Sequence, residues 1–167
     1  EVYVHPLWNG NVGEGGDIAV IVLAGGVPTG VDVYDIYRGT TEVGATFEKI
    51  GYGDTGTGET GYTYGDQQKR AGLNQYEVLD SAFGFYGDTL LYDFDNGDAQ
   101  YDAFGSLLGI TGLGLGNDEM SGAPGDSGGP NLNGGVIVGV TSYILSIPGE
   151  HDYLPGNNAS YGDMGGD

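Results

Sequence analysis

Residues 125–130 read Gly-Asp-Ser-Gly-Gly-Pro, and this hexapeptide decides the fold and the function that we expect for the chain. A serine between glycines can turn its hydroxyl outward, in a backbone that glycine adopts at little cost. We therefore predict that Ser127 is a nucleophile. The amide N–H groups of Gly125 and Ser127 are the expected donors to the oxyanion of an acyl-transfer intermediate. Asp126 would need a cation or several N–H donors if buried, so its predicted role is to hold the shape of the loop.

Three stretches resemble one protein family. Residues 125–130 resemble the active-site signature of the trypsin/chymotrypsin-type serine proteases. Residues 4–6 (Val-His-Pro), followed by residues 17–23 (Asp-Ile-Ala-Val-Ile-Val-Leu), are similar to that family's stretch around the catalytic aspartate. Residues 139–143 (Gly-Val-Thr-Ser-Tyr) are similar to the strand with which its substrates pair.

The resemblance implies a serine endopeptidase that works through an acyl-enzyme on Ser127, with Asp17 orienting the catalytic histidine. It implies peptide or protein substrates, no cofactor, and esterase activity as well, since esters are easier to cleave than amides. Residues 93–95 (Asp-Phe-Asp) resemble exported bacterial members in particular. We therefore expect a secreted or periplasmic protein.

The catalytic histidine has no match in this sequence. In the family it precedes the aspartate, yet the chain contains only His5 and His151. His5 stands where the family has a noncatalytic His-Pro. We expect the general base to come from a cleaved or otherwise missing N-terminal segment of the same protein. The alternative is a catalytically inactive protease-like fragment kept for binding.

A second enzymatic interpretation treats Gly125, Ser127 and Gly129 as the strand-to-helix elbow of an α/β-hydrolase-type esterase, with His151 as the base. This arrangement would complete catalysis within the chain. It requires a helix directly after the serine, and the sequence Gly-Gly-Pro-Asn at residues 128–131 is a poor start for one. Only this interpretation predicts loss of turnover when His151 is replaced.

Alignment on residues 125–130 implies a specificity pocket with Ser121 at its base and Ser142, Tyr143 and Ile144 on its wall. An aspartate at the base would attract a basic side chain, and Ser121 carries no charge. Because Ile144 is branched, it would narrow the mouth. We expect small or medium apolar side chains before the scissile bond.

The composition excludes several classes of partner. Four basic and 24 acidic residues give a net charge of −20, which argues against nucleic acid and anionic membranes. Such a surface suits high salt, where repulsion between like charges is screened, so a halophilic protein is one interpretation.

The longest apolar run, residues 18–24, is too short to span a bilayer. No disulfide can form, because cysteine is absent.

The glycine content predicts an all-β fold. No segment has a sustained helical stripe of apolar residues, and 36 glycines interrupt every candidate helix. The resemblance implies two antiparallel six-stranded barrels of the trypsin-like type, the first one incomplete in this chain. We predict that residues 1–65 hold the rest of the N-terminal barrel and the linker, and residues 66–167 the C-terminal barrel. We expect residues 51–65 to form a surface loop.

Three aspartates, Asp93, Asp95 and Asp98, gather around Asn96 and Gly97. Their spacing partly matches a calcium loop but lacks the downstream bidentate glutamate. Calcium is therefore one interpretation, and an acidic surface turn is the other.

Overall fold

The computed structural model describes residues 1–167 except 86, 147–148, 155–158 and 161. The described chain is built of β-strands, three 3-10 turns and the short helix α1 (Ala103–Leu108), which confirms the predicted all-β fold. The side chain of Asp102 precedes the helix and accepts the N–H of Gly105, and Gly109, whose φ is 72°, follows its last residue. Within the described ranges no helix is long and apolar enough to cross a membrane.

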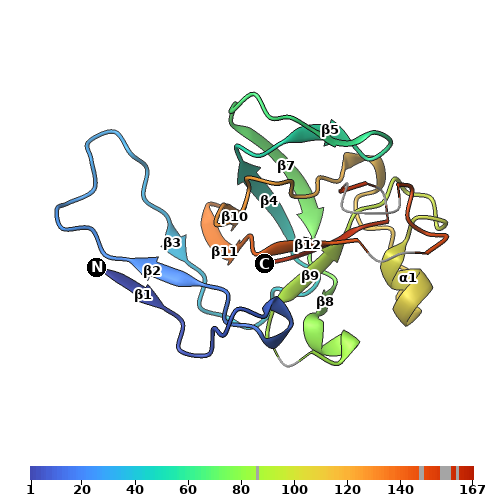
Figure 1. Cartoon of the computed structure of the whole chain (residues 1–167), viewed down its shortest axis with the longest axis horizontal. Coiled ribbons are helices and arrows are strands. Elements are labelled where there is room, and N and C mark those ends of the chain that lie inside the picture. Colours follow the sequence, from blue (N-terminus) through green and yellow to red (C-terminus); the bar gives the residue numbers. More distant parts are fainter. Residues whose placement is uncertain (86, 147–148, 155–158, 161) are drawn as a thin grey trace.

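Two sheets make up the body of the molecule (Figure 1). The larger has the strand order β3 (Asp35–Ile36), β11 (Val136–Val140), β10 (Pro130–Asn133), β4 (Thr46–Gly51) and β7 (Arg70–Gln75). The smaller has the order β12 (Tyr143–Leu145), β13 (Met164–Gly166), β9 (Leu90–Asp93) and β8 (Val78–Leu79). All these pairings are antiparallel except the parallel pair of β3 and β11.

Two hairpins complete the strands. The first pairs β1 (Val2–Val4) with β2 (Ala19–Ile21). The second pairs β5 (Thr55–Thr57) with β6 (Gly61–Thr63), inside the segment for which the sequence predicted only a loop. Hydrogen bonds between Thr57 and Thr60 close the turn of this hairpin, and such local contacts are difficult to read from glycine-rich sequence.

The core lies in the sheets and not in the first hairpin. One cluster joins β8, β9, α1 and β13, and a second contains Phe47 stacked on Tyr76 with ring centroids 4.1 Å apart. By contrast, every residue of β1 and β2 is exposed, with Val2 at 64% and Ile21 at 68%. Figure 1 shows this hairpin at one side of the body.

The predicted division between residues 65 and 66 remains a prediction. The strand β4 precedes this boundary, and it pairs with β7 and β10, which follow it. The hydrogen-bonded sheet that carries the Ser127 loop therefore includes residues from both sides of the boundary.

Candidate active site

Ser127 lies in a tight loop that ends at the start of β10. Gly125 and Gly128 have φ values of 101° and 80°, which side-chain-bearing residues rarely adopt. The N–H of Gly128 donates to the carbonyl of Thr141 over 2.8 Å, and the N–H of Thr141 donates to the carbonyl of Gly129 over 2.9 Å. These bonds fix the loop against the chain that follows β11.

Asp126 is buried beneath this loop and is held by backbone amides. Its Oδ1 accepts the N–H of Gly53 over 2.7 Å, and its Oδ2 accepts the N–H of Ala123 over 2.9 Å. Two N–H donors therefore compensate the buried carboxylate in the described structure. A side chain on Gly53 would collide with this carboxylate, since an added Cβ would lie 2.6 Å from Oδ1. The sequence predicted a supporting role for Asp126, but it could not identify the partner, which lies 73 residues away.

The N–H groups of Gly125 and Ser127 donate no hydrogen bond to any described residue. Ser127 is exposed, and its hydroxyl likewise has no partner in the described part of the chain. Both amides are thus available to a bound oxyanion, which is the chemistry that the sequence predicted for them.

A cavity of about 340 Å³ adjoins the serine. Ser127, Ser142, Tyr143 and Ile144 all line it, so the structure brings together four of the residues expected at the site. Ser121 does not line it. That side chain faces a neighbouring cavity of about 620 Å³, where its Oγ is buried.

Asp163 also lines the cavity beside Ser127, and the sequence analysis missed it. Its side chain is fully buried; Oδ2 accepts the N–H of Ser160 over 2.7 Å, while Oδ1 has no partner among the described residues. Burial, with a smaller contribution from Asp152, raises the pKa of Asp163 to about 6. No local motif marks this residue, because its segment reaches the cavity through long-range pairing, that of β13 with β12 and with β9.

Asp17 contacts the same region through Ser142. The hydroxyl of Ser142 donates to Oδ2 of Asp17 over 2.6 Å. Ser142 lines the cavity of Ser127 and also a second cavity, of about 430 Å³, that contains Asp17 and His5. Ser142 therefore bonds one of the two predicted catalytic residues, Asp17, and shares a cavity with the other, Ser127.

Neither histidine lines the cavity that contains Ser127. The backbone N–H of His5 donates to the carbonyl of Ile18 over 3.0 Å, and the ring Nδ1 of His5 accepts the backbone N–H of Leu7 over 3.3 Å. His151 is buried at 6% exposure. The α/β-hydrolase interpretation is wrong, because Ser127 is followed by β10 and the fold is all-β.

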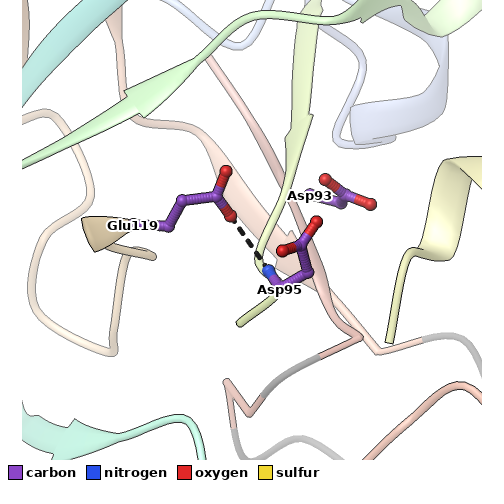
Figure 2. A group of neighbouring side chains, drawn as sticks. All are labelled: Asp93, Asp95 and Glu119. Carbon is purple, nitrogen blue, oxygen red and sulfur yellow. Dashed lines mark hydrogen bonds between the residues drawn. The ribbon is translucent and has the colours of Figure 1, made fainter. Parts of the chain in front are cut away.

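Three acidic side chains converge elsewhere in the molecule (Figure 2). Asp93 and Asp95 lie together as the sequence suggested, and the third member is Glu119. Asp98 is not part of this group; it is exposed, and its Oδ1 accepts the N–H of Gln100 over 3.0 Å. Glu119 reaches the group from a distant segment, and its Oε2 accepts the N–H of Asp95 over 2.9 Å.

Comparison with known proteins agrees with this geometry. None of the curated protein sequences matches the chain at a significant level. The family model described as Trypsin matches residues 1–157, which include Asp17, the loop of Ser127 and the lining residues 142–144. The chain therefore belongs to the trypsin family, the serine-peptidase type to which the hexapeptide around Ser127 pointed.

Proposed function

We propose that the protein is a serine endopeptidase that cleaves peptide and ester bonds through an acyl-enzyme on Ser127. One observation carries the proposal: Ser127 is exposed beside a cavity, in a loop whose Gly125 and Ser127 N–H groups are unengaged within the described structure. Such a pair of amides can stabilise the negative charge that develops on a carbonyl oxygen under attack, typically by about 3–4 kcal/mol.

The proposed reaction follows the roles of a catalytic triad. The Oγ of Ser127 attacks the scissile carbonyl carbon while a histidine takes its proton, and the same histidine then protonates the leaving amine. Water subsequently attacks the acyl-enzyme, again with the histidine as base, and releases the acid product. Asp17 would orient that imidazole and stabilise its charged form. The bond from Ser142 supports this role, because it fixes one oxygen of the Asp17 carboxylate.

The histidine would come from an N-terminal segment of the same protein that is not in this sequence. The hairpin of β1 and β2 supports this, because its apolar side chains are exposed, with Val2 and Val20 at 64% and 58%. Contiguous exposed apolar surface commonly marks a contact with further polypeptide. The export suggested by the sequence remains part of the proposal.

The position of Asp163 favours substrates that carry a basic side chain before the scissile bond. This residue presents a buried carboxyl to the cavity, and no basic residue pairs with it in the described structure. A lysine or arginine side chain of the substrate would supply the missing partner and offset the cost of ionising the buried carboxyl. This competes with the apolar preference that the uncharged Ser121 suggested, and Ser121 lies outside the cavity lining.

Intact mass measurement after exposure to a fluorophosphonate tests the proposed activity. The reagent labels only a serine whose proton a working base can take, so one adduct on Ser127 is expected when the histidine-bearing segment is present. A Ser127→Ala variant is the control and should remain unlabelled. If the protein with that segment gave no adduct on Ser127, the alternative of an inactive, protease-like binding protein would replace the proposal.

A further inference from the structure

We propose that Asp93, Asp95 and Glu119 bind one calcium ion, at a site separate from the cavity of Ser127. One carboxylate oxygen from each residue lies within 4.8 Å of the other two (Figure 2). Calcium binds oxygen at 2.3–2.6 Å, so two oxygens on one ion lie no more than about 5 Å apart. The three side chains therefore fit around a single ion.

Two of the three carboxylates are fully buried and have an oxygen without a partner. Asp93 and Asp95 are both 0% exposed. Asp93 Oδ2 accepts the N–H of Phe104 over 3.2 Å, and Asp95 Oδ1 accepts the N–H of Gly97 over 2.6 Å. The second oxygens, Asp93 Oδ1 and Asp95 Oδ2, accept no hydrogen bond from any described N–H or hydroxyl group. A buried carboxylate oxygen left unpaired is costly, and an ion between these atoms would satisfy both.

A fourth carboxylate, Glu77, lies next to this group. Both of its oxygens are buried, and its carboxyl is in hydrogen-bond contact with that of Asp93. Glu77 could approach the ion as a further oxygen ligand, and waters would complete the six to eight ligands that calcium takes.

No basic side chain neutralises the cluster. The chain has four lysines and arginines, and the two salt bridges among the described residues join Lys49 to Asp167 and Arg70 to Asp66. Several buried carboxylates at this spacing repel one another, and a divalent ion between them would offset that repulsion. The purely oxygen donor set favours calcium over transition metals, and calcium accepts a wider range of ligand arrangements than magnesium, which demands near-ideal octahedral geometry.

The position of Glu119 connects the site to the active loop. Glu119 is joined to Leu73 of β7 by an isolated parallel bridge, and the next residue, Met120, donates its N–H to the same Leu73. The chain then runs through Ala123, whose N–H holds Asp126. An ion at Glu119 would therefore fix the start of the segment that supports Ser127.

Titration calorimetry of the EDTA-treated protein with Ca²⁺, at high ionic strength, tests the site. High salt suppresses diffuse binding to a chain of charge −20. We expect one ion per chain and a melting temperature several degrees higher with Ca²⁺ than with EDTA. Mg²⁺ should bind at least tenfold more weakly. Absence of binding heat together with a melting temperature that Ca²⁺ does not change would overturn the proposal.

Matched variants distinguish calcium binding at this site from diffuse binding to the acidic surface of the chain. Asp95→Asn should weaken calcium binding at least tenfold, and its Oδ1 can still accept the N–H of Gly97. Glu119→Gln is a second variant with the same expected loss, should the first fold poorly. Asp98→Asn removes the same charge from the same loop, and its affinity should stay within about twofold of the wild type. Equal losses in Asp95→Asn and Asp98→Asn would contradict the assignment.

Discussion

Lys49 Nζ lies 2.9 Å from Asp167 Oδ1, and both side chains are fully buried. The ammonium also donates to Thr141 Oγ1 over 2.7 Å and lies 5.1 Å from the centroid of the Tyr92 ring. Burial lowers the pKa of Lys49 and raises that of Asp167, while their mutual attraction opposes both shifts. Thr141 also bonds the loop of Ser127 through its backbone, so this residue links the ion pair to the candidate active site.

Lys49→Met should destabilise the protein by about 3–5 kcal/mol, because it leaves the carboxylate of Asp167 buried without its cation. Urea unfolding monitored by circular dichroism measures the change. The double variant Lys49→Met with Asp167→Leu should recover much of the loss, since no unpaired charge remains. Lys69→Met, on an exposed residue, should change stability by less than about 0.5 kcal/mol. A cost for Lys49→Met as small as that of Lys69→Met would contradict the importance of the pair.

Gly53→Ala should distort the loop of Ser127, because the added Cβ would lie 2.6 Å from the carboxylate oxygen that the Gly53 N–H binds. We expect a loss of about 1–3 kcal/mol in stability and a slower reaction of Ser127 with a fluorophosphonate. Gly25→Ala is the matched control, since an added Cβ there meets no atom within 4 Å. Equal labelling rates in the two variants would show that the Gly53–Asp126 contact does not shape the loop.

Asp163 predicts a pH-dependent preference for basic substrates. Because the pKa of this carboxyl is raised to about 6, it is protonated below that pH and ionised above it. The ratio of kcat/KM for a lysine substrate to that for its norleucine analogue should therefore increase as pH rises through about 6. The ratio cancels the titration of the catalytic histidine, because that titration affects both substrates equally. Asp152 is the neighbouring carboxylate whose charge helps to raise the pKa of Asp163. In Asp163→Asn the ratio should be small and independent of pH; an unchanged ratio would exclude the role of Asp163.

The nucleophile loop could be predicted from local sequence, because Ser127 and its flanking glycines lie together in one hexapeptide. Ser142, Tyr143 and Ile144 were also predictable, through the resemblance of residues 139–143 to the family's substrate-pairing strand and the alignment on residues 125–130. Asp163 and Glu119 were not, because each reaches its cluster only through the folding of distant segments. Asp98 shows the opposite case: it is adjacent in sequence to the acidic group but lies outside it in the structure.

Asp17→Asn should lower kcat of the protein that carries the histidine segment by up to about 10⁴-fold with little change in KM, because an amide would hold the imidazole in the wrong tautomer. Steady-state kinetics on a peptide ester measure the change. Ser142→Ala removes the hydroxyl that fixes Asp17 Oδ2 and should cause a smaller loss, of about tenfold, since the carboxylate remains. Glu14→Gln, on the same segment but outside the three cavities, should leave kcat within about twofold. If Asp17→Asn and Glu14→Gln had equal kcat values, Asp17 would have no part in orienting the base.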